Sequence, residues 1–124
     1  MRALTIDGIW AWAIMAGHKR VENRSWRIKP GPLAIHAGLA RKRDAAARAA
    51  LESIGLAVPP DEEIPRGVLL GTVEVVDAVD LADYDPTGDP LAAGPIRNLL
   101  ADPRPFPEPI PAVGRQGLWN AAVE

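Results

Sequence analysis

The chain has 124 residues, of which 48% are hydrophobic, and this is enough for one domain with one core but not for two. It has no cysteine and only two histidines, which excludes a disulfide framework and a thiolate metal site and argues against structural zinc. No apolar run approaches the roughly 18 residues of a membrane span, and a signal sequence is lacking. We therefore expect a cytoplasmic protein with a single domain over residues 1–124.

The formal net charge of −2 is unevenly distributed along the chain. Residues 1–50 hold ten of the fourteen Lys and Arg residues but only three of the sixteen acids. This asymmetry predicts a basic surface formed by residues 19–29 and extended by residues 41–48, which would steer a polyanion to one face. The alternative is that the acids of the C-terminal part neutralise these cations in the fold.

The first half of the chain indicates two helices and two strands. An apolar run at residues 9–16 predicts a short buried helix, ended by Gly17 as its C-cap. Residues 21–26 and 33–37 are predicted to be strands, separated by a Pro-Gly-Pro break. An Ala- and Arg-rich stretch at residues 40–54 predicts the second helix.

The second half begins with a long strand. Apolar residues alternate with polar ones along residues 68–81, and Gly71 in this stretch suits a β-bulge. Residues 96–101 are predicted to form a short helix, and residues 117–121 a last strand. The chain is therefore expected to be mixed, with short strands and few helices.

Five prolines lie within the nine residues 103–111. Proline fixes φ and removes the backbone donor, so this spacing predicts an extended polyproline arm. Such an arm is either a stiff strap, held to the fold by Phe106 and Ile110, or a ligand for an aromatic groove on another protein.

The densest functional signal lies at residues 17–26. If this segment is extended, Glu22, Arg24 and Trp26 share one face, with Lys19 at the turn just before it. Arginine binds phosphate, an indole stacks on a base, and a carboxylate accepts from a base edge or a 2′-hydroxyl. The alternative is a solvated strand whose tryptophan packs on the core and whose Glu22 and Arg24 pair with each other.

Several motifs follow one another along almost the whole chain. They are Ala11-Trp12-Ala13-Ile14, Gly17-x-Lys19-x-x-Glu22-x-Arg24-x-Trp26, Gly31-Pro32-Leu33-x-Ile35-His36-Ala37, Gly71-Thr72-Val73-Glu74-Val75-Val76-Asp77, and Pro103-Arg104-Pro105 with Gly117-Leu118-Trp119. In this order they closely resemble the ASCH family, the activating signal cointegrator homology domains of the PUA-like superfamily. The resemblance implies an α+β fold, a small PUA-like β-barrel with short peripheral helices, and RNA binding. Some members of the family are reported to cleave RNA or to deacetylate N4-acetylcytidine.

The resemblance also places Lys19, Glu22, Arg24 and Glu74 around a cleft. In amidohydrolase members, a threonine at the position of Glu22 is thought to be the nucleophile, assisted by the residues that match Lys19 and Glu74. This chain keeps the lysine and the strand glutamate but has Glu22 in place of the threonine. Two uses of Lys19, Glu22 and Glu74 remain open: acid–base catalysis, or an ion-pair network that ties two strands together. Asn98 and Leu99 stand where an aromatic pair is common, a change expected to alter the rim of the cleft.

The candidates for contact with RNA or a nucleotide are Lys19, Arg24, Trp26 and His36. His36 lies in an apolar strand, where a histidine is either a satisfied structural residue or a ligand contact. We expect a protein that binds RNA or a modified nucleoside and needs neither a metal nor a cofactor. The alternative is a small metal-independent hydrolase, either a ribonuclease or an N4-acetylcytidine amidohydrolase, with Lys19, Glu22 and Glu74 as its catalytic groups. The sequence leaves open whether the protein is an enzyme and which proteins it contacts.

Overall fold

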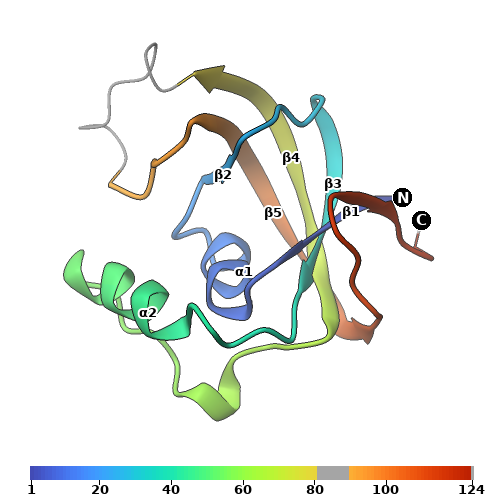
Figure 1. Cartoon of the computed structure of the whole chain (residues 1–124). Coiled ribbons are helices and arrows are strands. Elements are labelled where there is room, and N and C mark those ends of the chain that lie inside the picture. Colours follow the sequence, from blue (N-terminus) through green and yellow to red (C-terminus); the bar gives the residue numbers. More distant parts are fainter. Residues whose placement is uncertain (81–89, 124) are drawn as a thin grey trace.

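The computed structural model describes residues 1–80 and 90–123, and these residues form one mixed sheet with two short α-helices (Figure 1). The elements in chain order are β1 (Arg2–Ile6), α1 (Gly8–Met15), β2 (Val21–Arg24), β3 (Gly31–Ala37), α2 (Asp44–Ser53), the 3₁₀ turn η1 (Asp61–Glu63), β4 (Val68–Asp80), β5 (Ile96–Pro111) and β6 (Leu118–Asn120). This arrangement confirms the predicted α+β class. No helix within the described residues is long and apolar enough to cross a membrane.

The six strands lie in the order β2-β5-β4-β3-β1-β6. β1 runs parallel to β3, whereas the β1–β6, β2–β5, β3–β4 and β4–β5 pairs are antiparallel. β2 and β6 are the two edges of this sheet, and no pairing between described residues joins them. A closed barrel is therefore not confirmed.

One face of the sheet is covered by α1, and α2 lies beyond α1 (Figure 1). Ile14 of α1 is buried with Leu33 of β3 and Val73 of β4 in the main apolar cluster. A second cluster, which includes Ala13 and Leu51, joins α1 to α2. Because α1 leads directly into Lys19 and β2, this packing fixes the start of the segment that carries the functional signal.

Most of the predicted elements are confirmed, with small differences at their ends. α1, β2, β3, β4 and β6 lie within about two residues of the predicted ranges, and Gly17 follows α1 in a left-handed conformation with φ +82°. α2 begins only at Asp44, so the cationic residues 41–43 precede the helix instead of occupying its first turn.

The C-terminal part differs from the prediction. Residues 96–101 are not a helix, and residues 103–111 are not a free polyproline arm, because both belong to β5, which pairs with β4. Phe106 packs against a small apolar cluster as expected, while Ile110 is 38% exposed. β1 was not predicted at all, although it lies between β3 and β6 in the sheet.

Candidate functional site

A polar pocket of about 290 Å³ lies where β1 ends and α1 begins. β1 and the turn after it contribute to the pocket, α1 contributes Trp10, and β2 adds its polar side chains. The full lining is Thr5, Ile6, Asp7, Trp10, Lys19, Glu22, Asn23, Arg24 and Arg43. Three of these residues are cations and two are carboxylates, so the pocket has an excess of one positive charge.

Glu22 is the centre of the charged cluster in this pocket. It is 6% exposed, and its two carboxylate oxygens accept from two different cations. Lys19 Nζ lies 3.3 Å from Oε1, and Arg24 Nε lies 2.8 Å from Oε2. Lys19 Nζ also donates to the Val21 carbonyl at 2.7 Å and lies 5.1 Å from the centre of the Trp10 ring. Glu22 is thus a fixed counter-ion that orients both cations.

Arg24 is the more accessible of the two cations that bind Glu22. Its side chain is 28% exposed, whereas that of Lys19 is 5% exposed. Arg24 Nη2 donates to the Thr5 carbonyl at 3.2 Å, and the guanidinium carbon lies 5.9 Å from the centre of the half-buried Trp26 ring. This distance is near the limit for a cation–π contact. Glu22 and Arg24 therefore pair with each other, and Trp26 packs against the main apolar cluster, as in the alternative that the sequence left open.

Arg43 reaches the same pocket from the loop before α2. It binds Asp7 through two hydrogen bonds, of 2.7 and 2.9 Å. Hydrogen bonding to the Asp7 carboxylate, and its negative charge, raise the pKa of Arg43 above its usual value. The charge of Arg43 is thus matched within the pocket.

Asn98 of β5 holds the segment that carries this cluster. It is fully buried, and its Oδ1 accepts from the Ile28 backbone N–H at 2.8 Å. Its Nδ2 donates to the carbonyls of Glu22 and Trp26, at 3.2 and 3.3 Å. Residue 98 was expected at the rim of the cleft, but it lies beneath the segment and acts as its support. The sequence pattern singled out this position only as a departure from the family.

Two other predicted site residues lie outside this cluster. Glu74 is exposed on the face of β4 opposite to Val73 and Val75, and it does not line the polar pocket. Its neighbour there is Arg104, whose pKa is raised mainly by a hydrogen bond to Asp102, with a smaller contribution from the charge of Glu74. Glu74 is therefore not brought together with Lys19 and Glu22.

His36 is 1% exposed and has hydrogen-bond partners on both ring nitrogens. Its Nε2 donates to the Ala112 carbonyl, which can only accept, at 2.7 Å, and its Nδ1 lies 3.2 Å from the Thr5 hydroxyl oxygen. The Thr5 oxygen in turn accepts from Trp119 Nε1 at 3.1 Å. This chain of hydrogen bonds favours the structural role of the two that the sequence left open, and His36 lies outside the polar pocket.

Many of the basic residues in the N-terminal half have acidic partners. Arg27 pairs with Asp80 at 2.9 Å, and Arg41 pairs with Asp61 at 2.5 Å. Asp61 also accepts from Arg66, and this hydrogen bond is the main reason why its pKa lies below the usual value. These acids interrupt the predicted basic surface. Five of the ten cations in residues 1–50 make no ion pair with a residue that the structure describes: Arg2, Arg20, Lys29, Lys42 and Arg48.

Sequence comparison identifies the family to which this chain belongs. A model of the ASCH domain family matches residues 4–104, which run from β1 into β5. The chain belongs to the ASCH domain family. The matched part of this ASCH domain contains the whole Lys19–Glu22–Arg24 cluster and Asn98. A search of curated proteins found no significant match. Within the described residues no cluster of acidic, histidine or cysteine side chains is suited to hold a metal ion.

Proposed function

We propose that this ASCH domain binds single-stranded RNA, or a modified nucleoside within it, in the polar pocket beside Arg24. The observation that carries the proposal is the excess positive charge of this pocket, with the partly exposed Arg24 next to an indole. A cation beside an aromatic ring is the combination that single-stranded nucleic acids bind, because it serves a phosphate and a base together. ASCH membership supports the same class of ligand.

The contacts of Arg24 indicate how it would meet the ligand. Its Nε and Nη2 are held by Glu22 and Thr5, while Nη1 makes no hydrogen bond with a described residue. Glu22 and Thr5 thus fix the plane of the guanidinium and leave one nitrogen for a phosphate oxygen or a base edge. The half-buried Trp26, which lies beside Arg24 but does not line the pocket, would supply a stacking surface next to it.

The geometry supports binding better than hydrolysis. A catalytic set of Lys19, Glu22 and Glu74 would need the two carboxylates close together, and Glu74 lies on the other face of β4. The hydroxyl of Thr5, which lines the pocket, is engaged by Trp119 and His36.

We also infer that the sheet is an open form of the PUA-like barrel, with β2 and β6 as its edges. We further infer that the ligand is a cytoplasmic RNA.

Fluorescence anisotropy with labelled single-stranded RNA tests the proposal. We expect binding at low salt, with log K falling by about 0.7 for each phosphate contacted per unit of log salt, and weaker binding of duplex DNA. Arg24→Ala should weaken RNA binding about tenfold, within the range expected for a lost phosphate or base contact. Arg41→Ala is the matched control, because Arg41 is also an ion-paired arginine but lies outside the pocket. The absence of RNA binding, equal affinity for duplex DNA, or equal effects of the two substitutions would overturn the proposal.

A further inference from the structure

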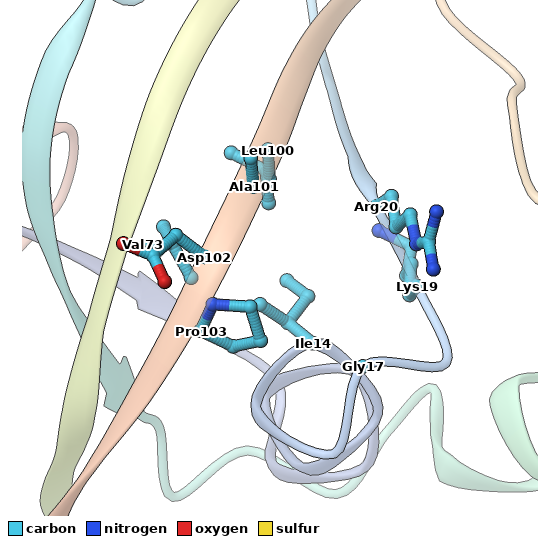
Figure 2. Close-up of a pocket in the computed structure, with 9 residues that line it drawn as sticks. All are labelled: Ile14, Gly17, Lys19, Arg20, Val73, Leu100, Ala101, Asp102 and Pro103. Atoms are coloured by element: carbon cyan, nitrogen blue, oxygen red, sulfur yellow. The ribbon is translucent and has the colours of Figure 1, made fainter.

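A second pocket, of about 300 Å³, is lined in part by Lys19 (Figure 2). Lys19 and Arg20 form one of its walls, and residues 100–103 of β5 form the opposite wall. Ile14 and Gly17, at the end of α1, and Val73 of β4 complete the lining. Because Lys19 lines both pockets, the two are neighbours.

The walls of this second pocket are mainly apolar. Ile14, Val73 and Leu100 present aliphatic side chains, and Pro103 adds its ring. A volume near 300 Å³ is at the lower end of the range for small-molecule sites. A pocket of this size with mainly apolar walls suits a small heterocycle such as a nucleobase.

A β-bulge shapes the β5 side of the pocket. Thr72 pairs with Arg104 and Glu74 pairs with Ala101, so the two β5 residues between them lie opposite a single β4 residue. Asp102 in this bulge has φ 55°, a left-handed conformation that costs a non-glycine residue about 1 kcal/mol or more. Bulges bend a strand and re-aim its residues, and they often occur beside functional sites.

The charges around the second pocket leave one cation without a partner. Asp102 binds Arg104 through contacts of 2.9 and 2.7 Å, and its carboxylate points away from Lys19 and Arg20 in Figure 2. Lys19 is paired with Glu22. Arg20 is exposed and makes no ion pair with a described residue, so its guanidinium is available to an anion beside the pocket.

We propose that this second pocket is a subsite for the adjacent nucleotide of the bound RNA, with the base against the apolar walls and a phosphate on Arg20. The inference rests on the proposed function, because the polar pocket beside Arg24 must hold the first nucleotide. Lys19 then stands between two consecutive nucleotides. The ligand is therefore a strand of at least two nucleotides and not a free nucleoside.

The test compares a short ligand with a long one in matched variants. Each ribonucleoside 5′-monophosphate and the corresponding homopolymeric RNA hexamer are titrated against the wild type, Arg20→Ala, Arg24→Ala and Lys29→Ala. Lys29 is the control, because it is exposed, makes no ion pair with a described residue and lines neither pocket. Arg20→Ala keeps the backbone carbonyl that accepts from the Leu100 N–H, so the contact between this segment and β5 is retained.

Arg20→Ala should weaken hexamer binding about tenfold and reduce the salt slope by about 0.7, while leaving monophosphate binding unchanged. Arg20→Glu should weaken hexamer binding further. Arg24→Ala should weaken both ligands, and Lys29→Ala neither. The subsite is disproved, and the proposed function stands, if Arg24→Ala weakens the binding of both ligands but Arg20→Ala behaves like Lys29→Ala. The same conclusion follows if the wild type binds the monophosphate as tightly as the hexamer. If the wild type binds neither ligand, the proposed function fails and the subsite fails with it.

Discussion

Two basic segments of this protein look alike in sequence but differ in the fold. Residues 19–24 and residues 41–43 each contain three cations. In the first segment, Lys19 and Arg24 share the single carboxylate of Glu22 at the edge of an open pocket. In the second, Arg43 pairs with Asp7, and Arg41 pairs with Asp61. Asp61 also binds Arg66, but Arg66 has Asp44 as a further partner, so two arginines meet two acids there.

The difference shows that the arrangement of acids, and not the number of cations, decides where an anion can bind. A cation with its own acidic partner contributes little to the potential outside the protein. Two cations that share one acid leave a net charge, and in the first segment this charge lies in a pocket that is wide enough for a ligand. Apart from a control, each substitution below changes a cation of one of these segments or one of the acids that bind them.

Lys19→Met should give the largest effect. The substitution keeps an apolar stem but removes the ammonium group, so the Val21 carbonyl and one oxygen of Glu22 lose their donor. A buried acceptor without a partner costs about 2 kcal/mol, and we expect the free energy of unfolding to fall by about this amount in urea titrations. RNA affinity should also fall, because the pocket loses its excess charge.

Lys29→Met is the control for this experiment, because Lys29 is exposed. It should change neither stability nor binding appreciably. A Lys19→Met protein as stable as the control would mean that the buried ion pair does not help to hold the segment in place.

Asp7→Asn should have an intermediate effect, of the opposite sign on binding. Asp7 balances Arg43 in the polar pocket, so its neutralisation raises the excess positive charge by one. RNA affinity should rise by about three- to tenfold at low salt, and the gain should shrink as salt screens the charges. The start of α1 should be retained, because the Asp7 side chain makes no capping hydrogen bond. An affinity equal to that of the wild type at low salt would contradict the role assigned to the pocket charge.

Asp61→Asn should have the smallest effect, confined to stability. The hydrogen bond from Arg66 lowers the pKa of Asp61 in the folded protein, so the ionised carboxylate stabilises the fold. This contribution is present above the unfolded pKa of about 3.9 and is lost as pH falls through the folded pKa. The variant should be slightly less stable than the wild type near neutral pH and equally stable in strong acid, with unchanged RNA affinity. Thermal unfolding of both proteins across this pH range measures the difference in stability. A difference that grows as the pH falls would contradict the prediction.

The sequence predicted the elements whose signals are local. α1 has an apolar run and a following Gly17, and β4 has a clear alternation of apolar and polar residues. The common side of Glu22 and Arg24 followed from strand periodicity, whereas Trp26 lies beyond the end of β2. These features depend on neighbours in the chain, and sequence patterns describe such neighbours well.

β5 was mistaken because its prolines oppose a strand assignment in most contexts. Proline at every second position removes donors from only one edge of a strand. β2 pairs with β5 only at residues 96–99. Within the described part of the chain, residues 103–111 therefore have a neighbouring strand, β4, on one edge alone. The placement of Glu74 away from Lys19, and of Asn98 beneath Glu22, depends on this pairing between distant strands. No local pattern contains that information.

β6 has a consequence for where the folded unit ends. The family match stops at residue 104, yet β6 pairs with β1, and Trp119 donates to the Thr5 hydroxyl that binds His36. The N-terminal amine also donates to the carbonyls of Ala121 and Val123. A protein shortened after residue 104 would leave β1 as an edge strand with unpaired backbone groups, which invites aggregation. β6 thus covers the edge of β1 and keeps this N-terminal strand from pairing with other molecules.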